Sequence, residues 1–311
     1  MTEAAEAWLR ETLRDRQIAL TGPIELVHSR PWSTVFQVPT GDSALFLKIC
    51  AATQVQEPRV IELVARESPD LVPGFVARHP TEAWVILRDG GARLRQVMPR
   101  LDQLAVWRAL LPRYAELQRS LLGREAELLD TGLMDRRLDR IPRLLERVLD
   151  DDRWAPHESR IRVRALLPAI ERLCAELARI GIGPSLDHDD LHDHNVLMQD
   201  GRPSIIDWGD ASLTHPFLAL AVTERFAALA AGIATDAPEI RALRESYLEP
   251  WTGLAPDAAL GRAAEIGSAL GLVTGGLTNY EIVTRLPGAH EEQPGEMEAV
   301  LGRIAQAIGA L

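Results

Sequence analysis

The sequence predicts an α+β protein with two lobes: a small lobe built on an antiparallel sheet over residues 1–90, and a larger, mainly helical lobe over residues 91–311. Two observations support this division. Segments rich in β-branched and aromatic residues, bounded by turn residues, are concentrated before residue 92. After that point, long segments carry apolar residues at helical spacing, with one interruption of strand character at residues 184–210. A chain of 311 residues is long enough for both lobes to have a core.

The small lobe is predicted to begin with a helix over residues 3–16 and to continue with strands in IELVHS, STVFQVP and SALFLKIC. Residues 40–42, Thr-Gly-Asp, are typical of a turn between the second and third strands, so we expect a short antiparallel meander. A helix over residues 57–68 follows, with a proline that its first turn tolerates. The segment AWVILRDGG adds one more strand and ends in a double glycine.

The larger lobe is predicted to be a succession of helices. The stretch LPGAHEEQPGE at residues 286–296 combines two prolines with charged residues, which is typical of an exposed loop. The segments with helical spacing are residues 101–122, 138–150, 158–180, 215–233, 237–249, 256–280 and 294–310.

The composition is that of an ordinary globular protein with an acidic balance, since 46% of the residues are hydrophobic, 25% are charged and the formal net charge is −11. Non-specific nucleic-acid binding requires a basic face, so we expect no nucleic-acid partner. The sequence has no apolar run of about 18 residues and begins with a charged, amphipathic segment, so we expect neither a membrane span nor a signal peptide. Cys50 and Cys174 lie far apart in apolar segments, which is typical of free thiols in a reducing compartment. We therefore expect a cytoplasmic protein, as a monomer or a homodimer.

The most unusual segment is DHDDLHDHN at residues 187–195, which continues as VLM, QDGR, PSII and DWGD. The Asp-Gly pair between two short apolar segments predicts a tight hairpin. This hairpin would bring Asn195, before its first strand, close to Asp207, after its second strand. Asp190 lies on the loop that enters the same end. Carboxylate and amide oxygens in such a group suit Mg²⁺, which shares its coordination with water and phosphates.

The three histidines of this segment, His188, His192 and His194, leave a second interpretation open. They alternate along the chain and would share one face of an extended segment, as the ligands of a zinc ion can. A zinc site would leave Asn195 and Asp207 without a role, so magnesium is the favoured ion.

The segment from His188 to Asn195 resembles the H-x-D-L-H-x-x-N catalytic loop of the aminoglycoside phosphotransferase family. Residues 206–208, Ile-Asp-Trp, resemble the Ile-Asp-Trp or Ile-Asp-Phe that follows the loop in that family. The resemblance extends in order over about residues 25–225. It implies a protein-kinase-like bilobal fold and Mg²⁺-dependent transfer of a phosphoryl group from ATP or GTP to a hydroxyl of a small molecule. An aminoglycoside or another antibiotic is one candidate for that molecule, so antibiotic resistance is one candidate role.

The resemblance also implies roles for the residues of the site. Asp190 would accept or orient the proton of the substrate hydroxyl, and Asn195 and Asp207 would hold Mg²⁺ against the phosphates. Lys48, in LFLKI, would hold the α- and β-phosphates, and Glu57 would orient Lys48.

The same resemblance places the nucleotide base at the connection between the lobes, residues 86–91, which contains Leu87 and Asp89. There Asp-Gly-Gly matches a D-x-G-G pattern of relatives. Ser33, in HSRPWST, would contact phosphates through its backbone N–H, although no G-x-G-x-x-G loop is present. His188 and His192 would support the catalytic loop.

Two residues of the helical part depart from the family pattern. Ala219 replaces an aspartate that starts a helix in the family, so we expect the local packing to differ there. Asp189 stands where the family has a glycine, and it adds a carboxylate beside Asp190. No long activation segment follows Asp207, which argues against a protein substrate. Asp210 is expected to be a turn residue.

The acceptor and two alternative functions are left open by the sequence. The chain can instead be a kinase-fold protein that binds nucleotide or ligand without transfer, or a hydrolase whose metal the histidines hold. The helices of the larger lobe offer candidate acceptor contacts, each of which is expected to be structural or solvated: Asp130, Asp135, Arg136, Trp251, Tyr280 and Glu281.

Overall fold

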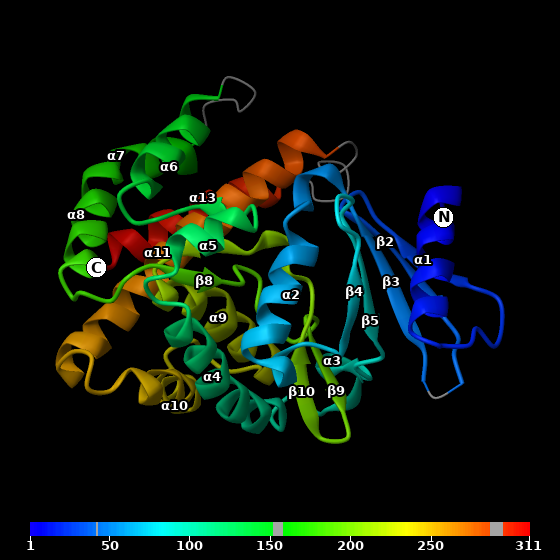
Figure 1. Cartoon of the computed structure of the whole chain (residues 1–311). Coiled ribbons are helices and arrows are strands. Elements are labelled where there is room, and N and C mark those ends of the chain that lie inside the picture. Colours follow the sequence, from blue (N-terminus) through cyan, green and yellow to red (C-terminus); the bar gives the residue numbers. More distant parts are fainter. Residues whose placement is uncertain (42, 152–157, 287–294) are drawn as a thin grey trace.

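The chain forms the predicted combination of a sheet-rich first part and a helical remainder (Figure 1). The computed structural model describes residues 1–41, 43–151, 158–286 and 295–311, so most of the loop predicted at 286–296 lies outside the described residues. The first part holds one antiparallel sheet in the order β1-β2-β3-β5-β4. Its strands are β1 (Glu25–Ser29), β2 (Ser33–Val38), β3 (Leu45–Cys50), β4 (Phe75–Arg78) and β5 (Trp84–Arg88).

Successive side chains of the central strand β3 point to opposite faces of this sheet, so one face is apolar and the other holds Lys48. Leu47 joins an apolar core with Leu9 of α1 (Glu3–Asp15), which covers one face. Lys48, the next residue, therefore faces the other way, into a cavity. Helix α2 (Glu57–Glu67) lies on that second side of the sheet, between the sheet and the helical remainder (Figure 1).

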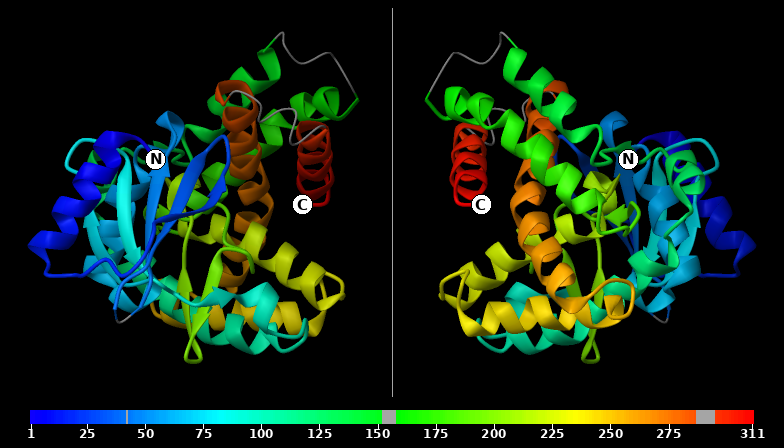
Figure 2. Two further views of the ribbon diagram at one scale, coloured as in Figure 1. Left: turned by 90° about the vertical axis from the view of Figure 1, so that its right-hand side faces the viewer. Right: turned by 90° about the vertical axis from the view of Figure 1, so that its left-hand side faces the viewer.

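The remainder of the chain is mainly helical, and its helices share one large apolar core. The 29-residue helix α11 runs through this region, with α9 and α13 beside it (Figures 1 and 2). The described helices are α3 (Leu94–Val97), α4 (Gln103–Ser120), α5 (Glu125–Asp130), α6 (Ile141–Asp150), α7 (Glu158–Ala165), α8 (Leu167–Ala178), α9 (Leu220–Ala231), α10 (Pro238–Leu248), α11 (Asp257–Arg285) and α13 (Glu296–Gly309).

Three predicted helical segments differ from the structure by a break or by more than three residues at one end, whereas the other predicted segments differ by three residues or fewer. The segment 158–180 forms two helices, because Pro168 lacks a backbone N–H and lies in the first turn of a new helix, α8. The segment 215–233 begins with a 3₁₀ turn over Pro216–Ala219, and α9 starts only after it. Helix α11 continues to Arg285, beyond the predicted end.

The predicted hairpin forms between two short strands, β9 (Val196–Gln199) and β10 (Arg202–Ile205). Asp200 and Gly201 at its turn have φ angles of 51° and 76°. Two consecutive positive φ angles are typical of the type I′ turn, which matches the twist of such hairpins. The hairpin is therefore specified locally, by the Asp-Gly pair and the apolar residues on either side.

Several short strands were missed by the sequence analysis. One of them, β6, extends the hairpin sheet to the order β10-β9-β6, and the other three form a second small sheet, β7-β11-β8. Each has only two or three residues, which is too short for a recognisable alternation of apolar and polar positions. They are β6 (Ala92–Arg93), β7 (Met134–Asp135), β8 (Ser185–Asp187) and β11 (Ser212–Thr214). Strand β4, with four residues, was missed for the same reason.

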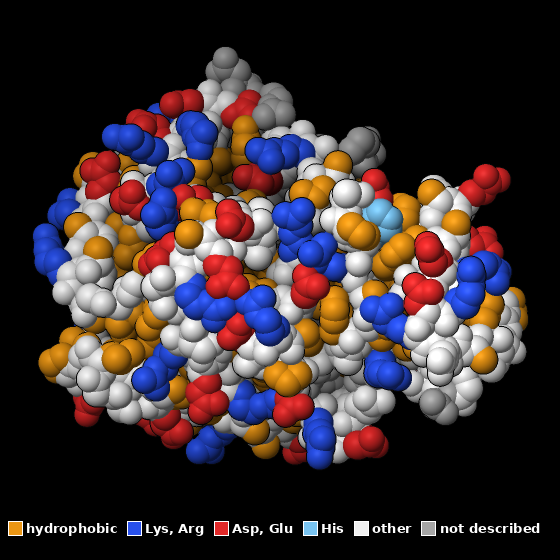
Figure 3. All heavy atoms as spheres, in the orientation of Figure 1, with side chains coloured by type: hydrophobic (Ala, Val, Ile, Leu, Met, Phe, Trp, Pro, Cys, Tyr) orange, Lys and Arg blue, Asp and Glu red, His pale blue; other side chains and the backbone are white. Residues whose placement is uncertain are grey.

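The surface carries charges of both signs. On the face shown in Figure 3, acidic and basic side chains are interspersed. One network of ion pairs consists of Arg66, Glu67, Arg124 and Glu127. Cys50 and Cys174 are buried free thiols. Within the described residues, no helix is both long enough and apolar enough to cross a membrane.

Candidate active site

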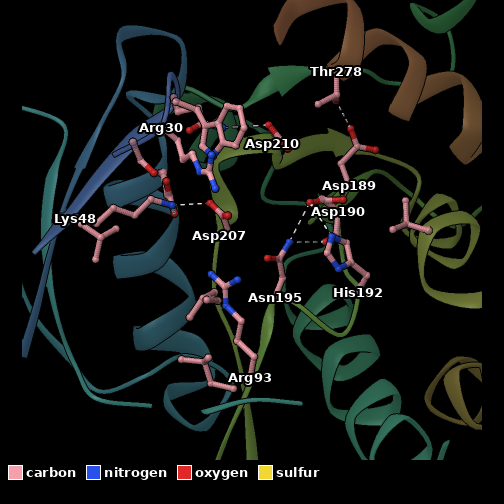
Figure 4. A pocket seen from close by; sticks show the side chains of 18 of the residues that line it. Arg30, Lys48, Arg93, Asp189, Asp190, His192, Asn195, Asp207, Asp210 and Thr278 are labelled. Atoms are coloured by element: carbon pink, nitrogen blue, oxygen red, sulfur yellow. Dashed lines mark hydrogen bonds and ion pairs between the residues drawn. The ribbon is translucent and has the colours of Figure 1, made fainter. Parts of the chain in front are cut away.

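A cavity of about 1050 Å³ lies between the β1–β5 sheet and the helical remainder (Figure 4). Both parts of the chain line it, so residues distant in sequence meet there. The sheet contributes Ser33, Lys48 and Leu87, and the catalytic-loop segment and hairpin contribute Asp190, Asn195 and Asp207. The far end is lined by residues of α9, α11 and α13.

Lys48 is the cation at the centre of this cavity. Its Nζ donates to Glu57 Oε1 at 2.7 Å and to Asp207 Oδ1 at 2.5 Å. Burial disfavours the charged lysine, but the two carboxylates outweigh it and raise the pKa of Lys48. Lys48 in turn lowers the pKa of Asp207, although burial acts in the opposite direction. The structure thus joins two residues of the sheet-rich part to a carboxylate of the helical part.

Glu57 is the most deeply buried member of this group, with no exposed side-chain surface. Besides Lys48, it accepts a hydrogen bond from Cys50 Sγ at 3.2 Å. Burial raises the pKa of Glu57, and the positive charge of Lys48 opposes this rise. Glu57 is the first residue of α2, where the helix dipole also favours a carboxylate.

Asn195 and Asp207 lie at the open end of the hairpin, as the sequence predicts. The backbone N–H of Ile206 donates to Asn195 O at 2.9 Å, which closes the hairpin between them. Asn195 Nδ2 donates to both the backbone and the carboxylate oxygens of Asp190, at 2.9 and 3.0 Å, so its Oδ1 is directed elsewhere. Asp207 has a left-handed backbone with φ of 68°, which aspartate tolerates and which turns its carboxylate into the cavity (Figure 4).

His188 and His192, which precede the hairpin, contact different partners. His188 Nε2 lies 3.0 Å from Ile206 O, and its Nδ1 accepts from the backbone N–H of Asp190 at 3.3 Å. Burial lowers the pKa of His188, which keeps the ring neutral in this arrangement. His192 Nε2 lies 3.3 Å from Asp190 Oδ2. The described residues contain no group of three or more histidine, cysteine, aspartate or glutamate side chains arranged to hold a metal ion.

The unusual Asp189 is part of a buried ion pair. Its carboxylate accepts hydrogen bonds from Arg136 and, at 2.6 Å, from the hydroxyl of Thr278. Arg136 and Asp189 each expose only 2% of their side chains, and Arg136 also donates to Thr274 O at 3.2 Å. Asp189 has φ of 64°, which explains why a glycine suits this position in relatives. The extra carboxylate is therefore neutralised.

None of the six candidate acceptor contacts lines the cavity. Arg136 holds Asp189, Asp135 pairs with Arg137, and Trp251 is fully buried against Phe217. The other candidates are Asp130, Tyr280 and Glu281. The cavity instead meets the neighbouring positions of α11, such as Thr278 and Ile282.

The sheet end of the cavity has two apolar walls. Phe46 and Leu87 come from the sheet, and Leu197 and Ile206 come from the hairpin. This arrangement can hold a flat ring between apolar side chains. Asp89, in contrast, turns its carboxylate back to the backbone N–H of Gly91 at 2.8 Å, so it shapes the connection between the two parts. 

Ser33, which is buried, lies on the cavity wall in β2, opposite Cys50 of β3. Four further polar residues of the cavity were missed or undervalued by the sequence analysis: Arg30, Gln54, Arg93 and Asp210.

Arg93 points toward Asn195 and Asp207 (Figure 4), and its guanidinium makes no hydrogen bond or ion pair with another described residue, although its backbone pairs with Leu197 of β9. Asp210 accepts from Gln54 Nε2 at 3.2 Å, and burial together with Asp190 and Asp207 raises its pKa well above the usual range. No motif marks these residues, although Arg93 closely follows the double glycine that ends β5.

The lysine on a small antiparallel sheet, the glutamate at the start of the following helix and the Asp–Asn pair at the open end of a hairpin meet at one cavity, and this combination is typical of kinase-like phosphotransferases. The sequence profile of the phosphotransferase enzyme family matches residues 27–260, and the chain belongs to that family. The predicted resemblance to the aminoglycoside phosphotransferases and the predicted kinase-like fold are confirmed.

Solved structures of low sequence identity share this fold over nearly the whole chain. Plasmodium vivax ethanolamine kinase has a TM-score of 0.65 at 12% identity, over 92% of this chain and 82% of its own. Choline kinase LicA from Streptococcus pneumoniae has a TM-score of 0.64 at 13% identity, over 99% of this chain and 100% of its own. The GDP complex of wild-type aminoglycoside 2'-phosphotransferase-IIIa has a TM-score of 0.57 at 15% identity, over 98% and 99%. No curated protein matches the sequence.

The family assignment makes the chain a small-molecule phosphotransferase. The side-chain contacts also argue against the hydrolase interpretation, in which the histidines would hold the metal. His188 is directed at Ile206 O and His192 at the Asp190 carboxylate.

Proposed function

We propose that this protein is a Mg²⁺-dependent kinase that transfers the γ-phosphoryl group of ATP or GTP to a hydroxyl of a small molecule. The observation that carries the proposal is the meeting of Lys48, Asp190, Asn195 and Asp207 at one cavity between the two parts of the chain. Family membership and the GDP complex of one structural neighbour support a nucleotide as the donor.

The oxygens at the open end of the hairpin fit a magnesium ion. Asp207 offers a carboxylate, and the amide of Asn195 is oriented by Asp190 so that Oδ1 is free to coordinate. Mg²⁺ prefers oxygen ligands and keeps waters or phosphates in its remaining positions, so two protein ligands suffice. When bound, the ion would neutralise charge on the nucleotide phosphates.

Asp190 is proposed to position the acceptor hydroxyl. Asn195 and His192 hold its carboxylate, so that it can accept a hydrogen bond from the incoming O–H. The acceptor oxygen then bonds to the γ-phosphorus, the bond from that phosphorus to the β,γ-bridging oxygen breaks, and the hydroxyl proton passes to Asp190. Phosphoryl transfer needs positioning and charge neutralisation more than covalent catalysis, which suits this set of residues.

The donor nucleotide is proposed to lie at the sheet end. Lys48 would contact the α- and β-phosphates, with Glu57 fixing its position, and Arg93 would add a second cation near the phosphates. The backbone of residues 86–91 would meet the base beside Leu87, and Asp89 would shape that segment. Ser33 would contact phosphate through its backbone.

A cytoplasmic location and a monomeric or homodimeric state remain predictions, and the acidic composition supports the absence of nucleic-acid partners. An antibiotic acceptor is one class among several for which the family provides kinases. Structural neighbours include kinases named for ethanolamine and for choline as well as an aminoglycoside phosphotransferase.

The test combines nucleotide binding with turnover. Thermal unfolding is measured with Mg²⁺–ATP and Mg²⁺–GTP, and release of ADP or GDP is measured with ethanolamine, choline, kanamycin and 3-phenyllactate. A nucleotide at 100 times its dissociation constant should add about 2.7 kcal/mol of stability. Lys48→Ala should lose this gain, whereas Asp190→Asn should keep it and lower turnover by about 10²–10⁴-fold, the usual contribution of a positioned proton acceptor.

Asp200→Asn is the matched control for Asp190→Asn, because it makes the same chemical change at an exposed turn position of the same hairpin. It should leave both readouts unchanged. No stabilisation by either nucleotide would overturn the proposal. Stabilisation with nucleotide release that is equal in wild type and Asp190→Asn would favour the binding protein without transfer.

A further inference from the structure

Beyond Asp190, the cavity continues between α9, α11 and α13, where apolar side chains form one part of the lining and polar side chains such as Arg225, Thr278 and Arg303 form the other. This acceptor end is lined by Val222 and Phe226 of α9, Leu272 and Ile282 of α11, and Val300 of α13. Five apolar side chains from three helices make a surface suited to an apolar body rather than to a heavily hydroxylated or polyamine ligand.

The carboxylates at the acceptor end already have cationic partners. Asp189 is held by Arg136, and Glu296 pairs with Arg303 at 2.6 Å. Asp190 is the carboxylate assigned to the reacting hydroxyl. Asp210 also lines the cavity near Asp189 and Asp190, but it accepts a hydrogen bond from Gln54, and burial raises its pKa well above the usual range, which disfavours its charged form. At this end, the described lining residues therefore offer little free negative charge for an ammonium group of the acceptor.

Arg225 of α9 is the complementary feature. It lines the cavity, makes no hydrogen bond or ion pair with any described residue, and its Nε is buried without a partner. Its guanidinium lies 4.3 Å from the ring centroid of Phe226, which holds it over the apolar wall. An arginine in such a place offers planar donors suited to a carboxylate or phosphate.

Arg225 lies close enough to Asp190, Glu296 and Arg303 for the charges of all three to affect it. Burial and the nearby Arg303 lower the pKa of Arg225, whereas Glu296 and Asp190 raise it. An arginine stays protonated even so, because its ordinary pKa lies above 12. The acceptor end therefore holds a partly desolvated guanidinium that no described side chain pairs with directly.

We propose that the acceptor is an amphipathic hydroxy compound with an apolar body and one anionic group, most simply a hydroxy acid, and that Arg225 binds the anionic group. The proposal rests on the proposed kinase function and names the substrate class of the same site. A cationic acceptor such as an aminoglycoside would instead place an ammonium group against an unpaired guanidinium. The negative net charge of the whole chain does not determine the charge of the preferred acceptor, because distant surface charges are screened and the charges lining the cavity act on the acceptor most strongly.

Gly275 of α11 allows a second, independent test of the acceptor end of the cavity. It lines the cavity, and a Cβ at this position would meet no atom within 4 Å. A larger side chain at residue 275 would therefore begin in open space and reduce the room at the acceptor end, while the nucleotide end stays open.

The experiment uses three probes with one skeleton and one hydroxyl: 3-phenyllactate, its amide, and 1-amino-3-phenylpropan-2-ol. Their affinities are measured by calorimetry on the full chain with Mg²⁺ and a non-hydrolysable nucleotide analogue. The expected order is carboxylate tightest, amide next and ammonium weakest. Arg225→Gln should weaken 3-phenyllactate at least about tenfold, as expected for a hydrogen bond between charged groups, and should change the amide much less.

Three further variants separate the possible causes. Arg225→Lys should keep the order of the probes, and Arg108→Gln, which removes the same charge at an exposed site on α4 outside the cavity, should change nothing. Gly275→Leu should lose all three probes but keep the nucleotide.

The proposal is overturned if the ammonium probe binds tightest, if Arg225→Gln leaves 3-phenyllactate unchanged, or if no probe binds although the nucleotide does. Failure of the kinase function itself would appear separately, as the absence of nucleotide binding.

Discussion

At residue 215, a histidine stands where the family pattern has an aspartate before proline. Its Nδ1 accepts a hydrogen bond from the backbone N–H of Phe217 at 3.3 Å, which caps the turn over Pro216–Ala219 as a carboxylate would. The ring is only 1% exposed, and burial lowers the pKa of His215 to about 3. A neutral imidazole therefore caps this turn without burying a charge in the core.

This burial predicts a specific pH dependence of stability. His215 has a lower pKa in the folded chain than its unfolded value of about 6.5, so its contribution is complete above pH 6.5 and is lost as the pH falls toward 3. Between pH 7 and pH 5, the loss from this residue should be about 2 kcal/mol. His215→Asn keeps an oxygen for the cap but removes the titration, so its unfolding free energy should fall by about 2 kcal/mol less over the same interval.

Urea unfolding of both proteins at pH 7 and pH 5 measures this difference. All other titrating groups are common to the two chains, so their effects cancel in the comparison. Equal losses in wild type and His215→Asn would show that the histidine is not held neutral in the fold.

The ion pair of Asp189 could not be predicted from the sequence. The sequence shows an additional carboxylate beside Asp190, and local spacing gives no reason to expect a partner. The partner, Arg136, comes from 53 residues earlier in the chain, and Thr278 comes from 89 residues later. Neither of these long-range contacts leaves a periodic or spaced signal, so the ion pair emerges only from the fold.

At the scale of elements, α11 approaches the turn over residues 216–219 unusually closely. A Cβ on Gly271 would lie 2.1 Å from the carbonyl oxygen of Leu218, and one on Gly267 would lie 2.5 Å from that of Phe217. Ala219, where the family has an aspartate, is 5% exposed in this contact. A carboxylate here would be buried and would need a partner, so the replacement by alanine and the close packing agree with each other.

Two glycines of α11 should consequently respond in opposite ways to the same substitution. Gly271→Ala forces a side chain against backbone, which cannot move freely, and should lower the unfolding free energy by about 1–3 kcal/mol. Gly275→Ala meets no atom within 4 Å and gains helix propensity, so it should raise stability by up to about 1 kcal/mol. Urea unfolding of both variants is the measurement. If both variants changed the unfolding free energy by a similar amount, helix propensity alone would determine the effect. In that case α11 could shift away from the turn to make room for the new side chain.

At the scale of the whole molecule, the segment 207–210 ties the sheet-rich part to the helical part. Lys48 bonds Asp207, Gln54 Nε2 donates to Asp210 at 3.2 Å, and Gln56 Nε2 donates to Gly209 O at 2.6 Å. The three partners on the sheet-rich side lie within nine residues of one another, at the end of β3 and just before α2. The site therefore forms where the two parts are held together.

The sequence predicts this centre because its residues lie in ordered motifs whose local geometry brings them together. The hairpin places Asn195 beside Asp207, and alternation along β3 turns Lys48 inward. Arg93 and Arg225 were not predicted, because nothing in the local sequence shows that their guanidinium groups end in the cavity without partners. Whether an arginine lacks a partner depends on the folded structure and cannot be seen in the spacing of residues along the sequence.

The tie between the two parts also predicts how the molecule responds when its central cation is removed. Lys48→Met leaves Glu57 without exposed surface and without its counter-charge, so the pKa of that carboxyl should rise further above its unfolded value. A raised folded pKa gives stability that is present at low pH and lost as the pH rises through it. At pH 8, the unfolding free energy of the variant should therefore be about 3–5 kcal/mol lower than that of wild type, which is the usual effect of leaving a buried charge without its partner. At pH 5, the difference in unfolding free energy should be distinctly smaller.

Urea unfolding at the two pH values tests this, with Lys48→Met/Glu57→Gln as the control. The double variant has no ionisable group at residue 57, so its difference from wild type should change little between pH 5 and pH 8 from this cause. A loss in Lys48→Met that is the same at both pH values, or that is larger at pH 5, would contradict the argument. It would mean that water or a local rearrangement solvates Glu57 once Lys48 is absent, and that the two parts of the chain separate more easily than their contacts indicate.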